Sequence, residues 1–305
     1  METTNPRRNK TMTFAEKLKT ARKNAGMSQD ALAEKLGVSR QAVTKWETGR
    51  GIPDIENIMI ISNLFGISVD EFLSSEKEAA PRKGFLYESR TEYDIDGKKH
   101  FDMNLGSAAE LRIIGSDGEK IVVTLGSNDK ALEEIAHDFK VKIDDGKGCA
   151  DIDIHRQKEV KEATAKASLV IEISLPNRYL SDVEASCNCG TVSIFGISCE
   201  DFEVEGKISN LKVDEFFGCL EVDSNLDMAI EVGSFEGSVE INQISATSRL
   251  SVKEGVAFRG IAHGRSVSIS YEDESGNACD DFSDTASGNV IELAGSKSEL
   301  LISRR

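Results

Sequence analysis

The chain reads GMSQDALAEKLGVSRQAVTKWETG over residues 26–49, and this run has the residues that typically begin and end two short helices joined by a tight turn. Ser28 can cap the first helix, because a serine hydroxyl accepts a hydrogen bond from an otherwise unpaired N–H of the first turn. Gly37 suits the left-handed residue that ends a helix. Ser39 can cap the second helix, which runs to about Trp46. The run therefore predicts two helices that follow each other closely.

The second of these helices has two different faces. Its apolar side chains fall together at helical spacing and should point inward, namely Ala42, Val43 and Trp46. Long hydrogen-bonding side chains are left on the outside, namely Arg40, Gln41, Thr44 and Lys45. Such a helix fits the major groove of DNA, where Gln pairs with the edge of adenine and Arg with that of guanine.

Helical patterns continue on both sides of this run. One apolar face precedes it and another follows it, comprising Phe14, Leu18 and Ala21, then Ile58, Ile61, Leu64 and Phe65. A capping box that begins at Ser68 opens a last helix ending near Leu73. We therefore predict a five-helix domain over residues 12–73. A polar arm with basic side chains precedes it at 1–11, and a polar linker that contains Pro81 follows it at 74–84.

Residues 26–49, together with the tail from Pro53 to Leu73, resemble the helix-turn-helix of the Cro/lambda-repressor type, also called the xenobiotic-response-element (XRE) family. The resemblance covers about a fifth of the chain. It implies that a set of positions faces DNA, namely Gln29, Ser39, Arg40, Gln41, Thr44 and Lys45. Gln29, at the start of its helix, would contact a phosphate and brace the recognition helix. The resemblance further implies an internal ion pair between Arg22 and Glu47.

The charge distribution agrees with a DNA-binding head. The whole chain has a net charge of −16, which by itself argues against a nucleic-acid partner. Residues 1–50, however, hold 11 Lys/Arg and 5 Asp/Glu, a net charge of +6, and the remaining residues carry −22. A basic head on an acidic body fits a protein that contacts DNA with one domain only.

The rest of the chain, residues 85–305, is predicted to be β-rich. Between Val183 and Val252, short apolar-x-apolar pieces begin at positions 183, 192, 202, 211, 220, 230, 239 and 250. Strands this short cannot bury an apolar edge alone, so successive repeats must stack. We favour a β-solenoid with two strands in each coil of about 19 residues. A β-sandwich built of hairpins is the alternative.

The segment Leu175-Pro176-Asn177, with the repeats that follow it, is similar to the putative-adhesin β-solenoid family of bacterial proteins. This resemblance is looser than that of the head, and it implies a fold rather than adhesion. The predicted fold class is therefore a multidomain α + β chain, an all-α head followed by an all-β domain.

Motifs for catalysis or metal binding do not emerge from the sequence. There are four His, and no nucleophile elbow, phosphate-binding loop or paired-His zinc motif is present. The six Cys lack zinc spacing, and the pattern fits structural thiols better than a metal or redox site. On the strand around Ile152, Asp151, Asp153 and His155 alternate and could bind a metal, but a solvated face is the better explanation of them. We expect no enzyme activity, no cofactor and no metal.

These observations favour a sequence-specific, DNA-binding transcriptional regulator, of the repressor kind, that binds operator DNA as a homodimer. The β-domain would serve as a sensor, an oligomerisation domain or a partner-binding domain. The competing hypothesis is a protein-interaction scaffold, in which the β-domain binds a partner and the helical head only docks. Because the sequence shows no long apolar run and no apolar signal region near Met1, we expect no membrane segment and a cytoplasmic location.

Overall fold

The computed structural model describes residues 14–25, 27–47, 53, 55–65, 84–273 and 275–305. The chain divides into two compact units, residues 1–84 and 85–305, and each has its own hydrophobic core. Several predicted features lie outside the described residues: the arm at 1–11, the fifth helix at 68–73, nearly all of the linker at 74–84, and the helix-ending Gly49.

The first unit is helical, with α1 (Phe14–Asn24), α2 (Gln29–Leu36), α3 (Arg40–Glu47) and α4 (Ile55–Phe65). The predicted cap of α2 is confirmed, because the Ser28 hydroxyl accepts a hydrogen bond from the N–H of Ala31 at 3.0 Å. Gly37 ends α2 with a φ of 66°, the left-handed conformation that the sequence predicted. None of the helices that the structure describes is both long and apolar enough to cross a membrane.

The second unit is built mainly of strands. Its first part comprises β1 (Tyr87–Asp94), β2 (Lys99–Ser116), β3 (Lys120–Ser127), η1 (Lys130–Leu132), α6 (Ile135–Asp138), β4 (Phe139–Asp145), β5 (Cys149–Arg156), α7 (Glu162–Ser168), β6 (Val170–Pro176) and η2 (Asn177–Tyr179). Its second part comprises β7 (Leu180–Phe195), β8 (Ser198–Glu205), β9 (Asn210–Asp214), β10 (Phe216–Asp223), β11 (Ala229–Val232), β12 (Phe235–Ile244), β13 (Thr247–Val252), β14 (Arg259–Glu272) and β15 (Val290–Arg304).

All the pairings among the strands from β7 to β15 are parallel and nearly all are in register. Val183 pairs with Phe202, Phe202 with Leu220, and Leu220 with Val239, so successive strands of one face are offset by about 19 residues. This is the repeat length that the sequence predicted. A sandwich built of hairpins needs antiparallel neighbours, so the parallel pairing overturns that alternative.

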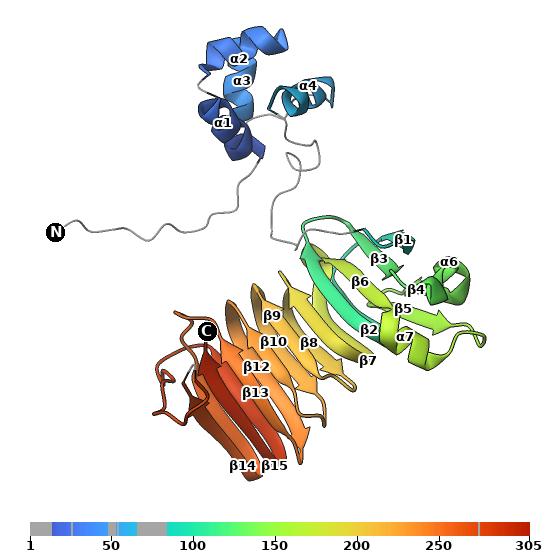
Figure 1. Ribbon diagram of the computed structural model, residues 1–305, viewed down its shortest axis with the longest axis vertical. Coiled ribbons are helices and arrows are strands. Elements are labelled where there is room, and N and C mark those ends of the chain that lie inside the picture. Colours follow the sequence, from blue (N-terminus) through green and yellow to red (C-terminus); the bar gives the residue numbers. More distant parts are fainter. Residues whose placement is uncertain (1–13, 26, 48–52, 54, 66–83, 274) are drawn as a thin grey trace, which may run out of the picture. The chain divides into compact units, whose positions relative to one another are not determined.

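The predicted β-solenoid needs a correction, because eight of its strands form a closed hydrogen-bonded ring, a barrel. Hydrogen bonding runs β7-β8-β10-β12-β15-β13-β11-β9 and returns from β9 to β7. The two long strands make this closure. Each of them bends, so that β7 pairs with both β8 and β9, and β15 pairs with both β12 and β13. Figure 1 shows β7 to β13 side by side, with β14 and β15 at the end of the array.

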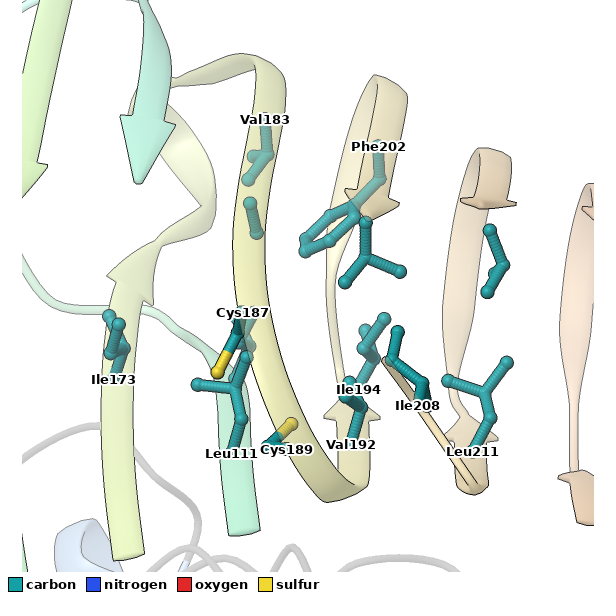
Figure 2. Close-up of a cluster of buried hydrophobic side chains, with 14 of the residues drawn as sticks. Leu111, Ile173, Val183, Cys187, Cys189, Val192, Ile194, Phe202, Ile208 and Leu211 are labelled. Carbon is teal, nitrogen blue, oxygen red and sulfur yellow. The ribbon is translucent and has the colours of Figure 1, made fainter. Parts of the chain in front are cut away.

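The core of this unit lies inside the ring of strands. Residues that pair in register stack along it, and Phe202, Leu211 and Val192 are essentially inaccessible to solvent. Figure 2 shows Cys187 and Cys189 among these apolar side chains, and both thiols are buried. Inward Val, Leu, Ile and Phe on every turn of the repeat explain why such short strands are stable: each buries its apolar side chains against the next coil.

Candidate nucleic-acid interface

The candidate DNA-reading helix is α3, and packing on one side holds it in place. An eight-residue helix is unstable alone in water, so its position depends on tertiary contacts. Val43 and Trp46 are buried in the core that α1 and α2 supply with Leu18 and Leu32. The opposite side of α3 and its cap are exposed to solvent, with Ser39, Arg40, Gln41, Thr44 and Lys45.

A buried ion pair joins α1 to the end of α3. The Arg22 guanidinium donates to both carboxylate oxygens of Glu47, from Nε to Oε1 at 2.5 Å and from Nη2 to Oε2 at 2.9 Å. Both residues are less than a tenth exposed. The remaining guanidinium nitrogen, Nη1, donates to the carbonyl of Met27 at 2.7 Å, in the residue just before the cap of α2. Arg22 thus ties the start of α2 and the end of α3 to one point on α1.

The electrostatics of this pair favour the charged state of both partners. Burial by itself would raise the pKa of Glu47, but the hydrogen bonds from Arg22 and Gln29 outweigh it and leave the pKa below its ordinary value of 4.5. The hydrogen bond to Glu47 likewise raises the pKa of Arg22. The head therefore holds a buried ion pair, charged at neutral pH, next to its candidate reading helix.

Gln29 connects this ion pair to the exposed face of α3. Its side-chain amide donates to Oε2 of Glu47 at 2.8 Å, and its carbonyl oxygen accepts from the Thr44 hydroxyl at 3.3 Å. The Thr44 hydroxyl also lies 3.0 Å from the backbone carbonyl oxygen of Arg40, so its single proton is shared between the two acceptors. The chain of contacts from Arg22 through Glu47 and Gln29 to Thr44 therefore fixes the orientation of the Gln29 side chain between α2 and α3.

One contact at this surface does not follow from the sequence. Asp30, in the first turn of α2, lies 3.5 Å from Nη1 of Arg40, and each side chain is about two-thirds exposed. Its place in the first turn of a helix, where an acidic side chain is favourable, accounts for Asp30 without any partner. Only the crossing of α2 and α3 brings it to Arg40, so no spacing rule would have found the pair.

The structure also places the residues that were weighed as metal ligands. Within the residues that the structure describes, no three His, Cys, Asp or Glu side chains are grouped so as to hold a metal ion. Asp151 and His155 are exposed, on the face of β5 opposite the buried Ile152 and Ile154. Their alternation is that of a solvated strand face.

Comparison with known proteins identifies the helical unit. Residues 18–72 match the family model described as helix-turn-helix. The HTH-type transcriptional activator BcrR of Enterococcus faecalis is 46% identical over 66 residues, 22% of this chain and 32% of BcrR. The prophage-derived regulator YonR of Bacillus subtilis is 40% identical over 60 residues, 20% of this chain and 56% of YonR. The phage transcriptional repressor RstR of Vibrio cholerae is 35% identical over 60 residues, 20% of this chain and 54% of RstR.

The similarity to solved structures covers the β-domain but is loose. A putative cell adhesion protein from Clostridium sporogenes has 11% sequence identity and a TM-score of 0.38, covering 72% of this chain and 100% of that one. A putative adhesin from Bacteroides fragilis has 12% identity and a TM-score of 0.39, covering 74% and 99%. TM-scores this low support no conclusion about the β-domain, and its resemblance to that family stays a prediction.

The shared part is the head alone. The chain spans between 32% and 56% of the length of the three relatives named above. Residues 18–72 are thus a helix-turn-helix domain similar to those of bacterial and phage transcriptional regulators, followed in this chain by an all-β domain.

Proposed function

We propose that this protein is a sequence-specific DNA-binding transcriptional regulator that acts in the cytoplasm and reads double-stranded operator DNA with α3. The observation that carries the proposal is the arrangement of α3. Its apolar side is buried, a buried ion pair holds its end, and its exposed side presents Arg40, Gln41 and Lys45. A rigid helix with planar, multi-donor side chains on its outer face suits the major groove.

Within this interface we assign different roles to different side chains. Arg40 and Gln41 lie in the first turn of α3, the part of a recognition helix that enters the groove, so they choose the sequence. Lys45 lies further along and contacts a phosphate. Gln29 begins α2, where helix N-termini favour phosphate, and it supplies affinity together with Ser39 and Thr44.

The direction of regulation and the domain roles are part of the proposal. We propose repression, because a head bound at an operator excludes polymerase without any further contact; the relatives include one named activator and one named repressor. Residues 1–11 form the arm, 12–73 the DNA-binding domain, 74–84 the linker and 85–305 the regulatory domain. That last domain senses a signal, assembles the homodimer or binds a partner.

The test is binding of the full-length protein to DNA. Selection from random duplexes should return a common site, and affinity for it should fall steeply with salt, because cationic side chains that bind phosphates release counterions. Gln41→Ala should change the ranking of single-base variants of that site, since a paired base contact contributes about 1–3 kcal/mol of discrimination. Lys45→Ala should weaken binding to all DNA variants alike and reduce the slope of log affinity against log salt concentration by about 1.

Two results would contradict the proposal in different ways. If selection enriched no sequence and binding showed no salt dependence, the scaffold hypothesis, with a head that only docks, would replace it. If the protein bound one site but Gln41→Ala left the ranking of variants intact, only the assignment of reading residues would be wrong.

A further inference from the structure

One outer face of the β-domain carries a continuous line of carboxylates. Seven pairings join them directly, strand to strand, and we call the line the acidic row: Asp144, Asp151, Asp102, Glu184, Glu203, Glu221, Glu240 and Glu292. At about 4.8 Å between strands, the row is roughly 34 Å long. Like charges directly opposite each other destabilise a sheet, so this row costs stability when nothing covers it.

The centre of the row is poorly compensated. Among the residues that the structure describes, no Lys, Arg or His side chain forms an ion pair with Glu203, Glu221 or Glu240. The side-chain amide of Asn242 donates a hydrogen bond to Glu221 at 2.5 Å. Burial, followed by the charge of Glu221, raises the pKa of Glu203; burial and neighbouring carboxylates also raise that of Glu240. Two histidines lie further out along the row, where His100 is 3.8 Å from Glu184 and His263 is 3.5 Å from Glu292.

The other half of the same ring provides an internal comparison. Its corresponding line, which we call the mixed row, contains acidic, basic and serine side chains: Glu172, Arg112, Ser193, Lys212, Glu231, Ser251, Ser303 and Glu272. Each acid there has a base within 4.0 Å: Arg112 for Glu172, Lys212 and Arg305 for Glu231, and Arg249 for Glu272. The fold itself therefore does not require a like-charge row.

A groove runs beside the acidic row. It has a volume of about 680 Å³, and its lining includes Glu205, Asp223 and Asn242, each two residues beyond a glutamate of the row and thus on the same face. Lys207 is the one basic side chain of the lining. Two apolar side chains in it are open to solvent, Leu226 at 38% and Ile244 at 60% exposed. The surface therefore combines a negative line with an adjacent apolar strip.

We propose that this face docks a basic, amphipathic peptide segment of a partner protein, with its cationic side chains on the acidic row and its apolar side chains on Leu226 and Ile244. Charge complementarity selects this occupant, since the row repels DNA and an acidic peptide alike. The inference rests on the partner-binding role proposed for the β-domain. It does not depend on whether the head reads DNA.

The experiment uses the full-length protein and a fluorescein-labelled peptide of alternating Lys and Leu. A length of about 12 residues spans the row when the peptide is extended. The row variant Glu203→Gln/Glu221→Gln/Glu240→Gln should bind the peptide about tenfold more weakly by fluorescence anisotropy, because exposed charge pairs each add a modest increment. The matched control, Glu172→Gln/Glu231→Gln/Glu272→Gln, makes the same change in net charge on the mixed row and should bind like wild type.

Ile244→Ser tests the apolar strip. This substitution should weaken the binding of the Lys/Leu peptide and leave the binding of a Lys/Ser peptide of equal length unchanged. Thermal melting checks folding and the premise together: the row variant should melt at a higher temperature than wild type, because repulsion is removed, whereas the mixed-row control should melt lower or unchanged.

Several results would overturn the proposal. The row variant and its control could lose equal affinity, which would make the binding a matter of net charge alone. The row variant could bind like wild type, or melt no higher. Calcium or magnesium alone could raise the melting temperature of wild type but not of the row variant while the peptide fails to bind, which would mark a metal site instead. Binding to the selected DNA site, measured on the same variants, separates these failures from a failure of DNA reading.

Discussion

At the scale of single residues, the head depends on a few polar side chains that cannot be exchanged independently. Arg22 satisfies three acceptors, two on Glu47 and one on the backbone of Met27. A buried charge that loses its partner is costly, whereas replacement of both partners by apolar residues can be neutral. The pair thus makes the position of α3 sensitive to a change at α1.

Arg22→Met should destabilise the head by roughly 3–5 kcal/mol, because Glu47 would be left buried without its counter-charge. The measurement is chemical unfolding of the full chain followed by fluorescence of Trp46, the single Trp of the sequence, which lies buried in α3. Arg40→Ala, a change at an exposed arginine, is the control and should alter the unfolding free energy little. Equal effects of the two substitutions would contradict a special role for the buried pair.

The same ion pair should make the stability of the head depend on pH. The pKa of Glu47 in the folded protein lies below its ordinary value of 4.5, so the stabilisation is complete above that value and is lost as the pH falls through the folded-state pKa. Unfolding of wild type, followed by Trp46 fluorescence, should need less denaturant on acidification. Glu47→Gln removes the titrating group, and its acid-dependent loss should be smaller. Parallel curves for the two proteins would show that Glu47 contributes nothing to the pH dependence.

At the scale of elements, the close approach of neighbouring strands decides where the β-domain needs glycine. Gly218 and Gly237 each lie two residues before an apolar piece of the repeat, a position that favours a turn. The structure instead places both inside strands, in β10 and β12, where they pair with each other. Gly237 has a φ of 119°, and a Cβ there would lie 2.1 Å from the carbonyl oxygen of Gly218. The glycine is needed because the backbone of the preceding coil passes too close for a side chain.

Gly237→Ala should therefore destabilise the β-domain by several kcal/mol, of which about 1–3 kcal/mol comes from the backbone conformation alone. Two controls separate the causes. Gly255 has a φ of 83°, and a Cβ added there would meet nothing within 4 Å, so Gly255→Ala carries the conformational strain without the clash. Gly148 has open space and no such φ, so Gly148→Ala should be nearly neutral. Circular dichroism of the β signal during unfolding would order the three variants, and equal losses at Gly237 and Gly255 would remove the close approach as a cause.

At the scale of the whole molecule, a single short α3 contacts only a few base pairs, so we expect two heads to act together on a site with two half-sites. Their centres should be about one helical turn, 34–36 Å, or a multiple of it apart. Light scattering of the protein and footprinting of the selected site measure this directly. A monomer that protects one asymmetric half-site would count against the homodimer.

Much of the head could be predicted from its sequence, because its determinants are local. The caps at Ser28 and Gly37 and the apolar spacing of α3 act within one or two turns of the chain. The role of Gln29 went further than its local signal, since its contacts to Thr44 and Glu47 join residues 15 and 18 positions away. Helix crossing, which periodicity does not describe, makes those contacts.

By itself, the sequence determined the division into an α-helical head and a β-rich body. It also determined the eight apolar pieces and the coil of about 19 residues that two of them make, since alternation and spacing reflect burial along one strand at a time. Only the tertiary structure decided that β7 and β15 bend to close the ring. The residues of β15 complete it by pairing with partners 52 positions earlier in the chain, in β12 and β13. The acidic row arises in the same way. Asp102, Glu203 and Glu292 are scattered along the chain, and only the register of parallel strands, set by the inward packing of the side chains between them, brings their charges into one line.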